Sequence, residues 1–270
     1  MSSATLFMGN PSWPALDAFA YSIIGLFLVL GVLLFIGTRG KDTRIYDARM
    51  AWFRAWMYFC VCWLLSWATG VLPTLLSQPL LNPEHLQQPA WWVFVIATWV
   101  TVLIGYLWVW PAGTVTYQRR FYPATTALIG VVWGFSEAQL FLAFWAIGER
   151  FLDAPWMVAV FTYLCASAAN GPLHLFYWDR YVSPDHNIYE WNIRKVMLAH
   201  NPLLILSLVF LVVWGDLGVY LLWPAFALFA SAIAQRFPAP WDTLSHGELE
   251  AQLGLCDVQT MSLPAAKRVR

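Results

Sequence analysis

Long apolar runs separated by short polar stretches dominate the hydropathy pattern of this chain. About seven of these runs approach the ~20 residues that an α-helix needs to cross ~30 Å of hydrocarbon. We therefore predict an all-α, polytopic membrane bundle of about seven transmembrane helices. The main alternative is six spans with one long broken segment. The expected spans are residues 17–37, 52–77, 91–111, 124–147, 155–177, 196–214 and 217–235, with a tight hairpin at Gly215 and Asp216 between the last two.

Basic residues mark one side of the predicted bundle. The intervening segments contribute only Arg150. Because cytoplasmic loops are enriched in Lys and Arg, we predict that the N-terminus lies outside and the C-terminus inside. We expect residues 1–236 to form the transmembrane bundle and residues 237–270 a short cytoplasmic tail. The basic residues follow the first, third, fifth and seventh spans: Arg39, Lys41, Arg44, Arg49, Arg119, Arg120, Arg180, Arg194, Lys195, Arg236, Lys267, Arg268 and Arg270.

Composition also separates this chain from soluble domains. Hydrophobic residues make up 60% of the chain and charged residues 11%, whereas about a quarter of residues are charged in soluble domains. The net charge of zero offers no basic face for nucleic acid. We therefore expect a multi-pass protein of a cell membrane, such as the bacterial inner membrane, in contact with the lipid bilayer. Whether it forms a homo-oligomer or joins a membrane complex stays open.

A carboxylate lies near the middle of the predicted span 124–147. Glu137 is costly at this depth, and ionisable residues inside spans often mark functional sites. Gly130 and Gly134 share its helical face and form a small-xxx-small pattern, so we expect this face to pack against another helix. Two interpretations remain: Glu137 is a buried catalytic acid, or it is a structural hydrogen bond between helices.

A polar stripe follows one face of the predicted span 155–177. Tyr163, Ser167, Asn170 and His174 recur at three- and four-residue spacing. Pro172 is expected to kink the helix beside them. Such a stripe either lines a cavity or forms hydrogen bonds between helices.

The stretch that follows contains the densest run of charged and amide side chains. We expect a helix that ends near His200, because Pro202 disfavours its continuation. His186 and Glu190 lie one turn apart on this helix and can touch, while Met197 and His200 share their face. The expected lining of a substrate cavity is Tyr163, Ser167, Trp133, Met197 and His200.

His174 and His186, together with Asp185, form a candidate metal site. Two His and one carboxylate suit zinc, iron or copper. The spacing Asn170-x3-His174-x11-His186 resembles the Asp-x3-His-x12-His copper-ligand pattern in the third subunit of membrane-bound methane and ammonia monooxygenases. It differs in the Asn and in a second spacing shorter by one residue. The alternative is a set of interfacial salt bridges and backbone hydrogen bonds, so the cofactor is either none or a single zinc, iron or copper ion.

These features predict an integral membrane enzyme that acts on a hydrophobic isoprenoid, sterol-like or other lipid substrate, as an isomerase or cyclase of lipid metabolism would. Glu137 would be the buried acid, and His174, His186 and Glu190 the base or relay beside Asn170, in a cavity opening to the cytoplasmic side. Aromatic residues could stabilise a carbocation. Three alternatives remain: a metal-dependent oxidase or monooxygenase subunit that uses His174 and His186, a proton-coupled transporter, and a non-catalytic membrane component.

Overall fold

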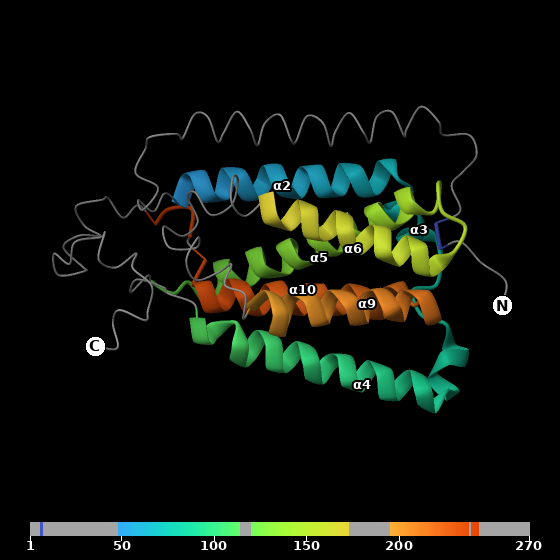
Figure 1. The fold of residues 1–270 in the computed structure, drawn as a ribbon. Coiled ribbons are helices and arrows are strands. Elements are labelled where there is room, and N and C mark those ends of the chain that lie inside the picture. The colour runs from blue at the N-terminus through green and yellow to red at the C-terminus, as the bar shows by residue number, and fades with distance from the viewer. Residues whose placement is uncertain (1–5, 8–47, 114–119, 173–194, 238, 243–270) are drawn as a thin grey trace.

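The computed structural model describes residues 6–7, 48–113, 120–172, 195–237 and 239–242, and within these ranges it is helical and contains no strand (Figure 1). The α-helices are α2 (Ala48–Ala68), α3 (Val71–Ser77), α4 (Pro89–Leu103), α5 (Pro123–Gly148), α6 (Pro155–Pro172), α9 (Asn201–Val213) and α10 (Leu217–Gln235). Two segments are π-helical: η2 (Ile104–Val109) directly follows α4, and η5 (Val196–His200) directly precedes α9. Two short segments are 3-10 helical: η1 (Pro83–Gln87) and η3 (Pro111–Gly113).

Four helical segments of the described chain are long and apolar enough to cross a membrane: Pro89–Val109, Pro123–Gly148, Val196–Val213 and Leu217–Gln235. A bent pair, Trp52–Ala68 and Val71–Ser77, makes a fifth if it is one span. Within the described residues, the prediction of an all-α chain with several helices long and apolar enough to cross a membrane is confirmed. The number of seven spans stays a prediction, because the expected span 17–37 and part of 155–177 lie outside the described residues.

The predicted single span 52–77 is broken in the structure. α2 and α3 meet at an angle of 72°. Gly70 lies between them in the left-handed region, at φ +85°, which costs glycine little because it has no Cβ. The chain therefore changes direction within this apolar run, which hydropathy alone does not show.

α5 lies at the centre of the bundle and packs closely on α10, as the Gly130 and Gly134 pattern predicted. A Cβ on Gly134 would lie 2.4 Å from the Cα of Ala225, and a Cβ on Gly130 would lie 2.8 Å from the Cα of Phe229. Only glycine allows two helix backbones to approach this far. The prediction that this face turns toward another helix is confirmed, and α10 is that helix.

The predicted hairpin at Gly215 is confirmed: Gly215 and Asp216 lie in the short connection between α9 and α10, and Gly215 has φ +71°. Asp216 is buried and accepts hydrogen bonds from the Asn82 backbone N–H at 2.9 Å and from Trp91 Nε1 at 2.8 Å. Its Oδ2 also lies 2.9 Å from Nδ1 of His85. This one carboxylate therefore joins the hairpin to η1 and to the start of α4.

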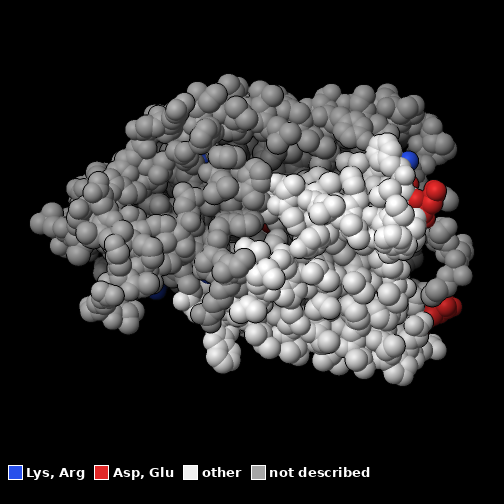
Figure 2. All heavy atoms as spheres, in the orientation of Figure 1, with Lys and Arg blue, Asp and Glu red and all other residues white. Residues whose placement is uncertain are grey.

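Charged residues of opposite sign gather at opposite ends of the described helices. The basic residues Arg54, Arg120, Lys195 and Arg236 lie near the start of α2, before α5, before η5 and at the end of α10. Antiparallel neighbours bring these positions to one end (Figure 1). Four of the described acidic residues lie at the other end together with the basic exception Arg150: Glu84, Glu149, Asp153 and the buried Asp216. Figure 2 shows acidic side chains at the surface of that end. Of the other described acidic residues, Glu137 lies in the middle of α5 and Asp242 follows the end of α10.

The N-terminal residues Leu6 and Phe7 are attached to the end of α5 by a carboxylate. Glu149 accepts hydrogen bonds from the backbone N–H groups of Leu6 at 2.7 Å and Phe7 at 2.9 Å. It also accepts one from Trp145 Nε1 at 2.8 Å. Burial raises the pKa of Glu149, an effect that the Trp145, Phe7 and Leu6 donors oppose. Phe7 is thereby held in the main hydrophobic core.

Replacing Glu149 by Gln is expected to destabilise the fold by about 1–3 kcal/mol, because an amide nitrogen would then face an N–H donor. A raised folded-state pKa also means that the wild type loses stability as pH rises through that pKa, whereas the Gln variant does not. Thermal unfolding in detergent at several pH values measures both effects. Hydrogen exchange at Leu6 and Phe7 provides a local check, since unchanged protection in the variant would show that Glu149 does not hold this segment.

Candidate functional site

Two π-helical turns face each other inside the bundle. A Cβ on Gly105 in η2 would lie 3.0 Å from the Cα of Ala199 in η5. A π turn contains an extra residue relative to an α-helix and is frequently found at functional sites. The next residues along the chain, Tyr106 and His200, both line one cavity. The two irregular turns therefore bring polar side chains from distant parts of the sequence together.

The prediction that a helix ends near His200 is wrong. Asn201 has φ −62° and ψ −44°, and the chain continues from η5 directly into α9. Pro202 follows η5 directly and lies inside this continuous helical segment. The wide π turn before it relieves the clash that a proline ring makes with the preceding helical turn. The helix therefore passes through this proline without a break.

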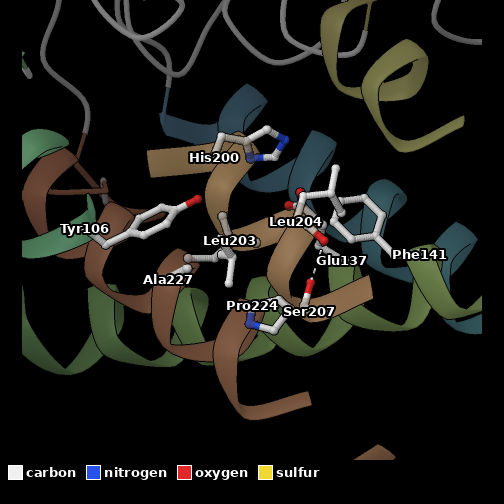
Figure 3. Close-up of a pocket in the computed structure, with 10 residues that line it drawn as sticks. Tyr106, Glu137, Phe141, His200, Leu203, Leu204, Ser207, Pro224 and Ala227 are labelled. Carbon is white, nitrogen blue, oxygen red and sulfur yellow. Dashed lines mark hydrogen bonds between the residues drawn. The ribbon is translucent and has the colours of Figure 1, made fainter. Parts of the chain in front are cut away.

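The cavity lies between η2, α5, η5, α9 and α10 (Figure 3). About 20 Å³ is open to the centre of a water-sized molecule, enough for about one water. Most of its wall is aliphatic or aromatic, and four side chains carry polar atoms. The lining residues are Tyr106, Glu137, Phe141, His200, Leu203, Leu204, Ser207, Pro224, Ala227 and Leu228.

Glu137 reaches this cavity from the middle of α5 and is only 7% exposed. Across the cavity, Pro224 interrupts the hydrogen bonding of α10. The Ser207 hydroxyl donates to the carbonyl of Leu204 at 3.0 Å, the bond drawn in Figure 3. The Glu137 side chain therefore borders a largely apolar space.

His200 is oriented by Asn170. The amide Nδ2 of Asn170 lies 3.0 Å from Nε2 of His200, and Asn170 is 3% exposed. An amide nitrogen only donates, so the imidazole accepts at Nε2 and carries its proton on Nδ1. If Nε2 gains a proton, a rotated amide can accept from it through Oδ1. Asn170 can thus support both protonation states of the imidazole.

The ring of Tyr106 is held at the cavity by an aromatic stack. It lies on the Trp110 ring with centroids 5.4 Å apart and an interplanar angle of 20°. The Nζ atom of the buried Lys195 lies 4.9 Å from the centroid of Trp110, a distance that allows a cation–π interaction. Figure 3 shows the Tyr106 hydroxyl pointing inward, on the side of His200.

Of the predicted site residues, Glu137 and His200 line the cavity, and Asn170 contacts His200. Four predicted cavity residues do not line it. Tyr163 and Ser167 are half-buried on α6, Trp133 is buried in the main core, and Met197 is 53% exposed.

The remaining predicted residues, His174, Asp185, His186 and Glu190, lie outside the described residues. In the part of the chain that the structure describes, no group of three or more His, Cys, Asp or Glu is arranged to hold a metal ion. The proposed zinc, iron or copper site therefore stays a prediction.

Sequence reasoning missed Tyr106, Ser207 and Pro224. Pro224 could have been selected from the sequence, because a proline within an apolar span often marks a cavity or a break in the helix. Tyr106 and Ser207 carried none, since each is a single weakly polar residue in an apolar run. Their role depends on which helices become neighbours.

The described fold is an α-helical bundle with several helices apolar enough to cross a membrane, and one cavity in it is lined by a carboxyl and an imidazole group. Comparison with protein-family models, with curated proteins and with solved structures finds no match to this chain.

Proposed function

We propose that this protein is an integral membrane enzyme that performs acid–base chemistry on a hydrophobic substrate, such as an isoprenoid, a sterol-like molecule or another lipid. One observation supports this most: a buried carboxyl, Glu137, and an Asn-oriented imidazole, His200, line the same largely apolar cavity. Proton donors and acceptors placed in this way contribute directly to proton-transfer catalysis.

In this proposal Glu137 donates a proton to the substrate and His200 removes one from it. The Asn170 amide beside Nε2 orients the imidazole, and removal of a proton at Nε2 requires this amide to rotate so that its oxygen accepts from the new N–H. The rings of Phe141 and Tyr106 supply negative π faces toward a developing carbocation. The net reaction is an isomerisation or cyclisation, because the proton gained and the proton lost balance. His174, His186 and Glu190 would extend the relay toward the cytoplasmic rim.

The size of the cavity limits what enters it. As described, the space of about 20 Å³ holds about one water, so in this proposal the reacting end of a substrate enters only when the lining side chains move apart. The remaining chain of the substrate lies between helices at the inner leaflet. Long hydrocarbon substrates suit this arrangement, because the transfer of their apolar surface from water to the space between helices is favourable. A soluble polar metabolite would lose its hydration here without replacement partners.

We also propose the full arrangement of about seven spans with the N-terminus outside and the C-terminus inside, in a membrane such as the bacterial inner membrane. The gathering of Arg54, Arg120, Lys195 and Arg236 at one end of the bundle supports this orientation. Homo-oligomers and membrane complexes are both compatible with the exposed apolar faces of α4 and α6.

The test compares lipids extracted from membranes that contain the wild type with lipids from membranes that contain the double variant Glu137→Gln, His200→Gln. Mass spectrometry is expected to show a product and a depleted precursor with the wild type alone. The variant Glu84→Gln, altered at an exposed carboxylate outside the cavity, should match the wild type. Identical lipid profiles for the wild type and the double variant, at equal protein amounts, would contradict the enzyme.

A proton-coupled transporter is a second candidate, supported by the number of irregular helices. The structure contains a 72° bend between α2 and α3, two π turns and Pro224 within α10. Transporters often place ion and substrate sites at such discontinuities. The protein reconstituted into vesicles that contain a pH-sensitive dye distinguishes the transporter from the enzyme. A transporter changes the internal pH and leaves the lipids unchanged, whereas the enzyme changes the lipids.

A further inference from the structure

One face of the apolar segment formed by α4 and η2 is exposed at the edge of the described bundle (Figure 1). The opposite face packs on α9 and α10 through a core that includes Trp91, Val95 and Val102. The exposed side chains recur at three- and four-residue spacing, so they share one helical face. We call this face the α4 stripe, and its members include Trp92, Val93, Ile96, Val100, Leu107 and Trp108.

The chemistry of the α4 stripe suits contact with hydrocarbon. No charged residue lies between Trp92 and Trp108. The half-buried Thr101 donates its hydroxyl to the carbonyl of Ala97 at 2.9 Å, and Trp92 Nε1 donates to the carbonyl of Leu86 at 2.8 Å. A polar group that faces hydrocarbon must find its hydrogen-bond partner inside the protein. Both donors on this face meet that requirement.

Tryptophan marks both ends of the α4 stripe. Trp92 is 46% exposed and Trp108 is 73% exposed, and their separation in the chain corresponds to roughly 24 Å of helix. This length is close to the ~30 Å of a bilayer's hydrocarbon core, whose two boundaries Trp rings favour. Trp156 at the start of α6 and Trp241 after α10 are also exposed, at the acidic and the basic end. We propose that the α4 stripe contacts the acyl chains of membrane lipids, with Trp92 at the outer boundary and Trp108 at the inner boundary.

The side chains of the α4 stripe favour lipid over a second protein helix. Interfaces between membrane helices are enriched in small residues, as the contact of Gly134 with α10 illustrates. Between Trp92 and Trp108, Ala97 and the half-buried Thr101 are the small residues that reach this face, and bulky side chains surround them. Bulky side chains hold a second helix backbone away, whereas flexible acyl chains fill the spaces between them.

The α4 stripe also places the candidate cavity within the membrane. Tyr106 precedes Trp108 by two positions, about 3 Å along the helix, so its end of the cavity lies near the inner boundary. η5 lies against η2 at this level, and from His200 to Ser207 the chain advances about 10 Å toward the membrane centre. In the proposed enzyme, the reacting group of the lipid is therefore near its headgroup. This consequence rests on the proposed function, but lipid contact is measured without turnover, so the two proposals can fail separately.

Photo-crosslinking of the full chain in nanodiscs of phosphatidylethanolamine and phosphatidylglycerol tests this contact. Benzoylphenylalanine incorporated in place of Val100, which is 48% exposed at the middle of the stripe, bonds to a neighbouring C–H group on illumination. Intact mass spectrometry is expected to show the chain with one lipid attached. The matched control position is Glu84, exposed on η1 beyond Trp92, where the yield of lipid adduct should be severalfold lower. A covalent dimer as the main product at Val100, or equal lipid yields at the two positions, zero included, would overturn the proposal.

A pair of charged substitutions tests the two depths. Val100→Lys places an ammonium group at the middle of the hydrocarbon, where a charge is costly. Trp108→Lys places the same group at the inner boundary, where a lysine side chain reaches the headgroups. The amount of protein integrated into membranes is expected to fall severalfold for Val100→Lys and to stay near the wild type for Trp108→Lys. Complete loss of Val100→Lys still decides by comparison with Trp108→Lys, and equal amounts of the two variants would contradict the assigned depths.

Discussion

Replacing Glu137 by Gln is expected to reduce turnover by about 10²–10⁴-fold, the range that a positioned general acid contributes. Glutamine has nearly the same shape and keeps an acceptor and a donor, so the packing of α5 against α10 should persist. It cannot transfer a proton. The measurement is the rate of product formation per mole of folded protein in nanodiscs, with the product defined by the lipid comparison.

The matched control is Glu84→Gln, which changes an exposed carboxylate on η1, outside the cavity lining. It should retain the wild-type rate. The structural interpretation of Glu137 makes the opposite prediction. If the carboxyl only forms a hydrogen bond between helices, Glu137→Gln lowers the unfolding temperature and leaves turnover per folded molecule unchanged. That outcome would end the assignment of Glu137 as the acid.

Replacing Gly134 by Ala is expected to destabilise the bundle by about 3 kcal/mol, at the upper end of typical overpacking costs. The new Cβ would lie 2.4 Å from the Cα and 2.6 Å from the carbonyl oxygen of Ala225. Backbone atoms within a helix cannot rotate away as a side chain does, so α5 and α10 must separate. Unfolding in detergent, followed by circular dichroism, measures the loss.

Gly148→Ala is the matched control for this prediction. Its Cβ would meet the side chains of Phe161 at 2.9 Å and Val158 at 3.2 Å, and these can shift. We expect a cost of about 1 kcal/mol or less for this variant. Equal stability of the Gly134 and Gly148 variants would show that the α5–α10 contact is looser than described. Because Glu137 lies one turn from Gly134, the Gly134 variant should also disturb the cavity.

The apolar spans were predictable to within a few residues where the structure describes them. The predicted ranges 91–111, 124–147, 196–214 and 217–235 correspond to Pro89–Val109, Pro123–Gly148, Val196–Val213 and Leu217–Gln235. The physical reason is that hydrocarbon offers no hydrogen-bond partners, so an apolar run of this length must form a helix. Hydropathy measures that requirement directly.

The interior irregularities were not predictable from the same pattern. Ile104–Val109 and Val196–His200 are apolar helical sequences whose π turns lie against each other at Gly105 and Ala199. Hydropathy does not distinguish a π turn from an α turn, and a proline such as Pro202 suggested a helix end where the helix continues. The bend at Gly70 was hidden for the same reason.

The amino-acid sequence by itself determined that this chain forms apolar helices. It also determined that Glu137 lies within one of them, where a carboxylate is costly, and that Gly130 and Gly134 allow close contact with another helix. Only the tertiary structure decided that His200 and Tyr106 share a cavity with Glu137, and that Asn170 orients His200. Helix formation depends on residues close in the chain, whereas the cavity depends on which helix faces meet. That choice is made by packing between segments up to about a hundred residues apart.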